Sequence, residues 1–219
     1  MRRLLPRLLL VGAIAGLTAY VLLRDPGPVD PASLPADLRL RVLILGKPDD
    51  PRIVPTREAI AFWNAELGRL GRRVRFDSPT SSADSVPEEV LRGAGSEVRL
   101  GFGPATSRLQ RTLASVPAEV VIALSESDLI SYGVRWRVGR KGVVALRSAD
   151  AFPLSLPNTV RNVVAHELGH VLGLGHNRDS TTLMCGRPAA CRPSAFASDT
   201  PWFFPLTVEE ERVVRDRWP

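Results

Sequence analysis

The alternation of apolar and polar residues along this chain predicts a mixed β-sheet packed on helices. Period-two alternation and short apolar runs predict strands at 38–46, 72–78, 96–103 and 118–127. Two apolar runs around a Gly-Arg-Lys-Gly turn predict a hairpin over 133–148. Apolar residues at helical spacing predict a helix over 55–71, and Thr207 with Glu210 forms the capping box of a closing helix. Strands interspersed with helices around one core indicate an α+β fold with an α/β-like layered arrangement.

Two stretches between these elements have no clear period. The polar segment before the strand at 96–103 is predicted to be a loop with a short helical turn at 86–93. The stretch at 185–205 contains several prolines and is predicted to be an irregular excursion.

The N-terminal segment, residues 1–24, differs from the rest of the chain. Arginines precede an uncharged apolar run at 8–23, which is typical of a signal peptide or a membrane anchor. The small-x-small site at 13–15 would leave an apolar region too short for a cleaved signal, so we favour an uncleaved anchor over secretion after cleavage. The positive-inside rule then places the remainder outside the cytoplasm. A proline-rich connector at 25–37 precedes a single domain over 38–219.

The formal charge of +6 and the pI near 10.3 raise the question of nucleic-acid binding. Three of the positive charges, Arg2, Arg3 and Arg7, belong to the N-terminal segment. The other arginines are scattered singly among apolar and acidic residues and form no basic stripe with interleaved aromatic residues. The composition therefore argues against a nucleic-acid partner.

A second helix is predicted at 159–172. Asn158 is a residue type that caps helix N-termini, and Gly173 can adopt the left-handed conformation that ends a helix. The expected apolar stripe of this helix consists of Val160, Val164, Leu168 and Val171.

All three histidines of the chain, His166, His170 and His176, lie within one eleven-residue stretch. The first two are four residues apart on the predicted helix and away from its apolar stripe, so they can aim two imidazole nitrogens at one ion. The following Gly-Leu-Gly lets the chain turn back and bring His176 to the same point. Three imidazoles with an open fourth position are the geometry of a catalytic zinc ion. Glu167 can then take a proton from zinc-activated water and deliver it to a leaving amine, which indicates hydrolysis.

The stretch "HELGHVLGLGH", followed eight residues later by Met184, resembles the signature of the metzincin zinc endopeptidases. Within that clan, "HNRDSTTLM" is similar to the matrixins, the matrix-metalloproteinase-like group, in its spacing and in Asp179 and Leu183. The resemblance covers about 158–184, and the fragment at 96–103 is similar to a matrixin sheet strand. It implies a zincin-like fold, with a twisted mixed sheet on an N-terminal helix and an active-site helix, and a small C-terminal subdomain ending in a helix. It also implies that Met184 forms the hydrophobic floor of the site in a methionine turn, without binding the metal.

Some positions depart from the matrixin pattern. Asn177 stands where matrixins usually have serine, and Cys185 stands where they usually have tyrosine. No further histidine exists for a second, structural zinc, and no glycine- and aspartate-rich loop indicates Ca²⁺. In an oxidising compartment Cys185 and Cys191 could close a small disulfide loop, and the alternative is a pair of free, partly buried thiols. By the resemblance, the segment after Cys185 lines the primed-side specificity pocket.

The sequence therefore predicts a membrane-tethered, extracytoplasmic metalloendopeptidase that acts on a protein or peptide through one catalytic zinc. Two alternatives stay open: a catalytically silent, zinc-containing binding module, and a zinc hydrolase of a non-peptide amide or ester. Glu167 argues against the silent module, because an inactive relative is expected to lose this glutamate first. The pattern of residues predicts neither the substrate sequence nor the oligomeric state.

Overall fold

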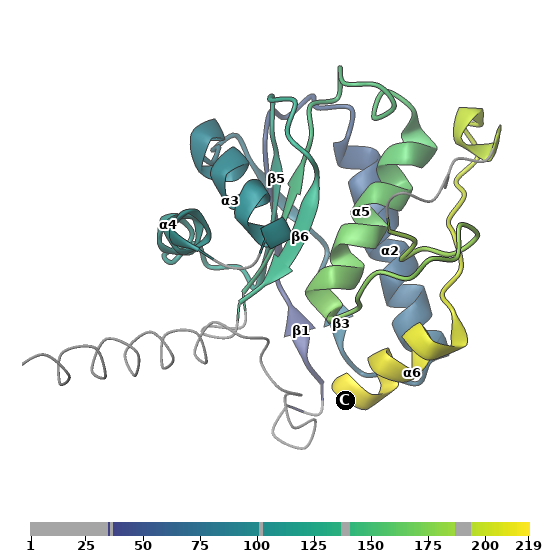
Figure 1. Ribbon diagram of the computed structural model, residues 1–219. Helices are drawn as coiled ribbons and strands as arrows, with labels where there is room; N and C mark the ends of the chain where they lie inside the picture. The colour runs from purple at the N-terminus through teal and green to yellow at the C-terminus, as the bar shows by residue number, and fades with distance from the viewer. Residues whose placement is uncertain (1–34, 36, 101–102, 137–140, 187–193) are drawn as a thin grey trace, which may run out of the picture.

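The protein is described from a computed structural model, which defines residues 35, 37–100, 103–136, 141–186 and 194–219 (Figure 1). The strands are β1 (Arg39–Leu40), β2 (Val42–Leu45), β3 (Arg75–Phe76), β4 (Thr80–Ser82), β5 (Val120–Leu124), β6 (Tyr132–Arg135) and β7 (Gly142–Leu146). The helices are α2 (Ile53–Arg69), α3 (Glu88–Leu100), α4 (Pro104–Thr112), α5 (Pro157–Leu172), α6 (Val208–Arg217) and the short 3-10 helix η2 (Ser194–Ala197).

Five strands form the central sheet in the order β4-β2-β5-β7-β6. The first four are parallel to one another, and β6 runs antiparallel to β7 at one edge. A separate parallel pair joins β1 to β3. These observations confirm the predicted α+β fold with a mixed sheet. They also confirm the hairpin over 133–148, whose turn lies outside the described residues.

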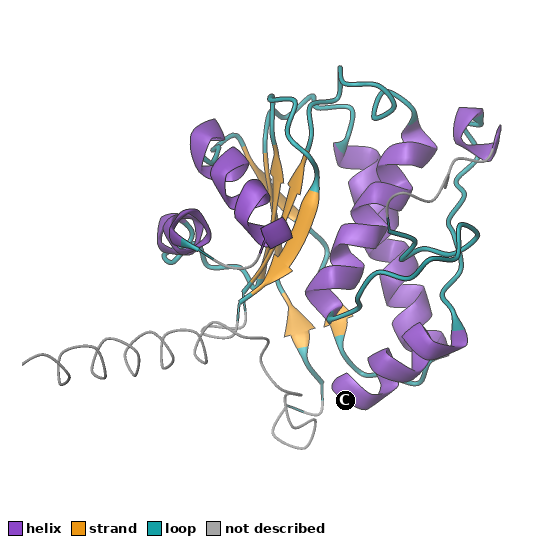
Figure 2. Cartoon of the chain, in the orientation of Figure 1, coloured by secondary structure: helices purple, strands orange, loops and turns teal. Residues whose placement is uncertain are grey.

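Helices cover both faces of this sheet (Figure 2). α2 and α5 lie on one face, and α3 and α4 lie on the other. In β5, Val120 and Ile122 belong to the core under α2 and α5, whereas Val121 and Ala123 belong to the core under α3 and α4. Because both faces are covered, every residue of β5 and β7 is buried. This burial is the reason why both strands are continuous apolar runs in the sequence.

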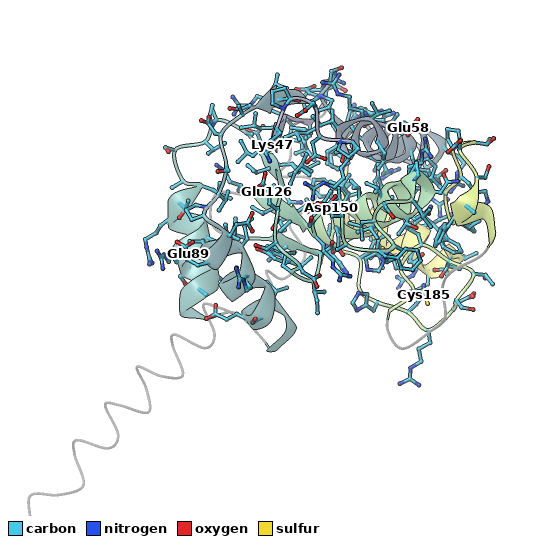
Figure 3. The ribbon with its side chains drawn as sticks, turned by 90° about the horizontal axis from the view of Figure 1, so that it is seen from above. Lys47, Glu58, Glu89, Glu126, Asp150 and Cys185 are labelled. Carbon is cyan, nitrogen blue, oxygen red and sulfur yellow. The ribbon has the colours of Figure 1, made fainter. Side chains whose placement is uncertain are left out.

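One arginine ties the start of α2 to the ends of β5 and β7. Arg52 is 3% exposed and pairs with Asp50 at 2.6 Å. Its guanidinium also donates to the carbonyl oxygens of Ser125 and Arg147, at 2.8 and 2.5 Å. A buried guanidinium needs such partners to offset its lost hydration. The ion pair of Lys47 and Glu126, by contrast, lies at the surface (Figure 3).

The prediction of a strand at 96–103 is wrong, because residues 96–100 belong to helix α3. The period-two alternation of that fragment is too short to outweigh the helical spacing of the apolar residues that precede it. The side chains of α3 that form this stripe and enter or border the core are Val90, Leu91, Ala94 and Val98.

Two short elements, α4 and β4, were not predicted. β4 is a polar edge strand of three residues, without an alternating apolar pattern. α4 has no side-chain cap from its own N-cap residue. The carboxylate of Glu97 on α3 accepts the amides of Ala105 and Thr106 instead, at 2.8 and 2.6 Å. A cap that lies this far away in the sequence is not visible to local capping rules.

Two predictions concern residues that the structure does not describe. The N-terminal segment and nearly all of the connector at 25–37 lie outside the described residues. Among the helices of the described part, none is long and apolar enough to cross a bilayer.

A tryptophan sets the packing of α2 against α5. Trp63 is fully buried, and its indole nitrogen donates to the Ala165 carbonyl oxygen at 2.7 Å. A Cβ atom added to Gly169 on α5 would lie 3.4 Å from the same indole ring. Trp63 therefore fixes how closely α2 approaches the helix that carries two of the histidines.

We expect Trp63→Phe to lower the free energy of unfolding by about 1–2 kcal/mol, because much of the ring volume is kept while the hydrogen bond is lost. Trp63→Ala is expected to cost about 3–5 kcal/mol through the cavity that it leaves. Urea denaturation followed by circular dichroism measures both. Val208→Ala, at a residue that is 82% exposed, is the control and should change stability by less than about 0.5 kcal/mol. Equal stability of Trp63→Ala and this control would contradict the assigned role.

Candidate metal centre

Buried asparagines hold helix α5 in place. The predicted N-cap role of Asn158 is wrong, because the helix begins at Pro157 and its N-cap residue, Leu156, makes no side-chain cap. Asn158 is fully buried, and its amide nitrogen donates to the carbonyl oxygens of Ser198 and Thr200 at 2.7 and 3.0 Å. Proline at the first helical position has no amide hydrogen that would need a cap. The asparagine therefore serves tertiary structure instead of capping.

Asn162, one turn further along α5, holds the same excursion. Its amide nitrogen donates to the Trp202 carbonyl oxygen at 2.8 Å, and its amide oxygen accepts the Phe204 amide at 2.8 Å. The irregular stretch at 185–205 is thus attached to the active-site helix by side chains that satisfy its backbone groups. Periodicity alone could not predict this attachment.

The end of α5 agrees with the sequence prediction. Gly173 has φ of 96°, in the left-handed region. The amide of Leu174 donates to the Gly169 carbonyl oxygen at 2.9 Å, and the chain then reverses toward His176. The predicted stripe of Val160, Val164, Leu168 and Val171 is buried, as expected.

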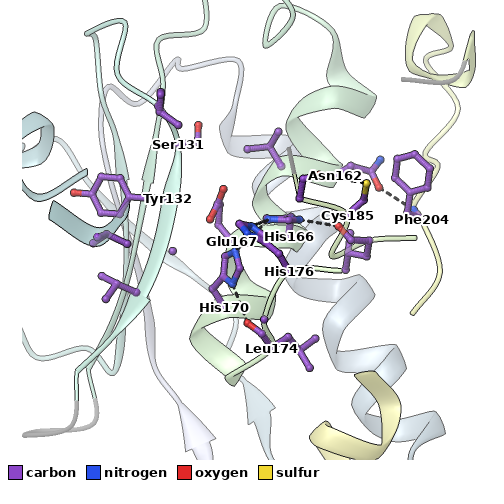
Figure 4. A pocket seen from close by; sticks show the side chains of 18 of the residues that line it. Ser131, Tyr132, Asn162, His166, Glu167, His170, Leu174, His176, Cys185 and Phe204 are labelled. Atoms are coloured by element: carbon purple, nitrogen blue, oxygen red, sulfur yellow. Dashed lines mark hydrogen bonds between the residues drawn. The ribbon is translucent and has the colours of Figure 1, made fainter. Parts of the chain in front are cut away.

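The three histidines come together as the sequence predicts (Figure 4). The Nε2 atoms of His166 and His170 are 3.1 Å apart. Those of His166 and His176 are 3.1 Å apart, and those of His170 and His176 are 3.0 Å apart. His166 and His170 are half-buried, whereas His176 is exposed.

Backbone carbonyl groups fix the tautomers of two rings. Nδ1 of His166 lies 2.7 Å from the Leu183 carbonyl oxygen, and Nδ1 of His170 lies 2.9 Å from that of Leu174. A carbonyl oxygen accepts only, so each Nδ1 carries the hydrogen. Burial, together with the neighbouring imidazoles, lowers the pKa of both rings to about 4, so they are neutral at pH 7. Their Nε2 atoms therefore present lone pairs and not hydrogens.

The Nε2 lone pairs of His166 and His170 cannot hydrogen-bond to each other, so their short separation suits a shared cation. Zinc fits the donor set, because neutral imidazole is a preferred zinc ligand. Tetrahedral ligands at Zn–N distances of about 2.0–2.1 Å are about 3.3–3.4 Å apart, close to the separations found here. These three residues can hold one metal ion.

Glu167 lies beside the triad and between α5 and β6. The residue is 7% exposed, and its carboxylate is directed toward β6 (Figure 4). Burial raises the pKa of Glu167 to about 8, against the opposing effect of a hydrogen bond from the Gly133 amide. A Cβ atom added to Gly133 would lie 2.1 Å from the Glu167 carbonyl oxygen, so only glycine permits this approach of strand and helix. The sequence analysis did not find this role of Gly133.

Met184 is fully buried under α5. A Cβ atom added to Gly169 would lie 2.5 Å from the Met184 sulfur. Gly169 lies between the two helical histidines, so the methionine packs directly beneath their turn of helix. This placement agrees with the floor that the resemblance implies for Met184.

A buried glutamate of α6 anchors the loop after His176. Asn177 donates through its amide nitrogen to Glu210 Oε1 at 2.5 Å and to Thr182 Oγ1 at 2.9 Å. The other oxygen of Glu210 accepts the Thr207 amide at 2.8 Å and completes the predicted capping box. Asn177, one of the residues that depart from the matrixin pattern, thus connects the loop of the third histidine to the closing helix. Only the capping half of this role has a local sequence signal.

A cleft of about 930 Å³ opens beside the triad. Strand β6 forms one wall, with Gly133 and Arg135 among its lining residues. Helix α5 forms the base, and Phe204 lies on the side opposite β6 (Figure 4). Phe196 and Leu183 also line the cleft.

Cys185 also lines this cleft and is disulfide-bonded. Cys191, its predicted partner, lies outside the described residues, so the expected pairing stays a prediction.

Residues 131–197, about a third of the chain, match the family model of the matrixins. No curated protein sequence matches the chain. Among solved structures, archaemetzincin from Methanopyrus kandleri is similar at 19% identity, over 82% of this chain and 94% of that one, with a TM-score of 0.47. The matrixin match confirms the metzincin resemblance predicted from the histidine motif.

We expect Glu210→Gln to weaken metal binding roughly tenfold, because glutamine has one acceptor oxygen and cannot accept from both Asn177 and the Thr207 amide, as Glu210 does. Competition for Zn²⁺ against a chromogenic chelator measures the affinity. Glu209→Gln is the matched control, since Glu209 is the exposed neighbour on the same helix and pairs with Arg212. His170→Ala should abolish binding. Indistinguishable affinities of the two glutamine variants would show that the metal site does not depend on Glu210 accepting from both Asn177 and Thr207.

Proposed function

Because residues 131–197 match the matrixin family, we propose that this protein is a zinc-dependent endopeptidase. His166, His170 and His176 hold the ion through their Nε2 atoms, and Glu167 is the general base and acid. A zinc ion supplies a Lewis acid there, which polarises a substrate carbonyl and makes water more acidic. The observation that supports this proposal most directly is the convergence of three imidazole Nε2 atoms beside a buried carboxylate.

Glu167 moves the proton in this mechanism. Its carboxylate accepts a proton from the attacking water and then delivers it to the nitrogen of the leaving amine. Burial raises the pKa of Glu167 and so favours the protonated carboxyl. A nearby bound cation would lower this pKa and favour the carboxylate, so the two effects oppose each other. The amide of Gly133 orients the carboxylate.

Strand β6 supplies a backbone surface for a peptide substrate. One edge of β6 pairs with β7, and the other lies at the end of the described sheet, along the cleft. An extended peptide can add to such an edge through main-chain hydrogen bonds, which carry little dependence on sequence. A peptide bond in this position would pass between β6 and the triad.

Glu167→Gln is expected to reduce peptide hydrolysis by at least roughly a hundredfold while zinc stays bound, because the proton acceptor is lost and the ligands are kept. Turnover of a fluorogenic peptide library and the zinc content of the purified protein measure the two effects. Glu126→Gln, at a surface carboxylate paired with Lys47, is the control.

The same assay separates the alternatives. A zinc-loaded wild type that cleaves no peptide but binds one would indicate a silent binding module. Hydrolysis of esters or non-peptide amides without peptide cleavage would indicate a different zinc hydrolase. Undiminished turnover by Glu167→Gln would refute the role given to this residue.

We further propose that residues 1–24 anchor the chain in a membrane and place the domain at 38–219 outside the cytoplasm. The arginines before an uncharged apolar run support this arrangement. We expect the full-length protein to fractionate with membranes and to retain its first residues in mass spectrometry of the mature N-terminus. A mature chain that begins after the apolar run would indicate secretion after cleavage instead.

A further inference from the structure

We propose that Thr159, near the start of helix α5, recognises the hydroxyl group of a tyrosine side chain in the substrate. This inference rests on the proposed peptidase function and adds a residue that determines specificity, together with the class of side chain that it selects. Its basis is a buried hydroxyl group that belongs to the lining of the cleft and has no hydrogen-bond partner.

The hydroxyl group of Thr159 is unpaired. The residue is 5% exposed, and its Oγ1 atom is shielded from solvent. Within the described part of the chain, three buried side-chain groups make no hydrogen bond, those of Thr56, Trp136 and Thr159. Of these three residues, Thr159 alone lines the cleft beside the triad. A buried hydroxyl without a partner costs free energy, and a ligand that bonds to it recovers that cost.

This hydroxyl can turn toward the cleft. Threonine in a helix divides between two χ1 rotamers, because its Oγ1 can bond a backbone carbonyl oxygen of the preceding turn. The Oγ1 atom of Thr159 makes no such bond. Rotation about its Cα–Cβ bond therefore breaks no hydrogen bond, and Thr159 already borders the cleft.

Thr159 lies on the face of α5 that carries the triad. His166 is seven residues further along, which is close to two full turns, so the two side chains project in nearly the same direction. Val163 lies between them and also lines the cleft. Thr159 and His166 are about 10.5 Å apart along the helix axis. A long substrate side chain beside the scissile bond can cover this distance, whereas a short one cannot.

The surroundings of Thr159 in the cleft are largely apolar. Helix η2 packs against α5, and its Phe196 lines the cleft together with Phe204. These two rings meet edge to face, with centroids 5.8 Å apart. The amide nitrogen of Asn162 donates to two backbone carbonyl oxygens, so this side chain has no donor left for a ligand. This end of the cleft therefore offers aromatic surface and one hydroxyl group.

Tyrosine is the side chain that best matches this combination. Its ring can pack edge to face against Phe196 and Phe204, and its hydroxyl can pair with that of Thr159. Amide and charged side chains need more hydrogen-bond partners than one hydroxyl supplies, so their burial here would be costly. Phenylalanine would occupy the same space but would leave the hydroxyl of Thr159 unpaired.

Matched peptides test this preference. Each pair of peptides differs only by tyrosine or phenylalanine at one position, which is moved through an uncharged sequence with blocked ends. Full-length, zinc-loaded Glu167→Gln is used for binding by fluorescence anisotropy, and full-length protein that retains Glu167 is used for cleavage. Thr159→Val and Thr159→Ser are made in both backgrounds. Thr56→Val is the matched control, because it removes a buried, unpaired hydroxyl that does not line the cleft.

We expect tyrosine to bind roughly three- to tenfold tighter than phenylalanine at one position of the peptide. In cleavage the gain should appear mainly in KM, because the contact is made equally in the ground state and the transition state. Thr159→Val should remove the preference, and Thr159→Ser should keep most of it because the hydroxyl remains. Thr56→Val should leave the preference unchanged.

Equal binding of tyrosine and phenylalanine at every position would overturn the proposal, and so would an unchanged preference in Thr159→Val. The first comparison needs no substitution of Thr159, so it decides the question even if a variant at this residue does not fold. The two proposals fail separately. Absence of peptide cleavage in the wild type overturns the peptidase function, whereas the binding measurement requires no turnover.

Discussion

Three imidazole nitrogens held 3.0–3.1 Å apart are the constraint on which the rest of the structure depends. With both helical rings hydrogen-bonded to carbonyl oxygens through Nδ1, the triad gains nothing from its own close approach. The surrounding contacts hold the three rings in an arrangement that suits a shared cation.

Those contacts come from several elements that are distant in the sequence. Trp63 fixes the position of α5 from one side, and Gly133 allows β6 to approach it from the other. Met184 fills the space under Gly169, where a larger residue could not fit. Leu183 orients His166 through its carbonyl oxygen, and its amide donates to the carbonyl oxygen of Pro205 at the end of the irregular stretch. The three histidines are therefore close together in the sequence, but several of the residues that hold them in place are distant from them.

The sequence predicted those features that have a local physical cause. The helix over 55–71, the buried strand β5 and the capping box of α6 follow from apolar spacing and capping chemistry, and the structure confirms them. The histidine cluster was predictable because helical spacing and a glycine-induced reversal determine its geometry. The failures have tertiary causes. Asn158 binds a distant excursion instead of capping α5, and α4 is capped by Glu97 of another helix. Gly133 and Glu210 have roles that require knowing which elements meet.

The hydrogen bond between Asn177 and Glu210 has a thermodynamic consequence for assembly of the domain. This hydrogen bond joins the loop that carries His176 to α6. Metal binding orders the loop, and an ordered loop favours docking of α6. Linkage is reciprocal: docking raises the affinity for the ion by the same factor by which the ion favours docking. During synthesis the three histidines are made before Glu210. The nascent chain therefore contains all of its proposed metal ligands before Glu210 can anchor the loop that carries His176. Tight retention of the ion would then coincide with completion of the fold.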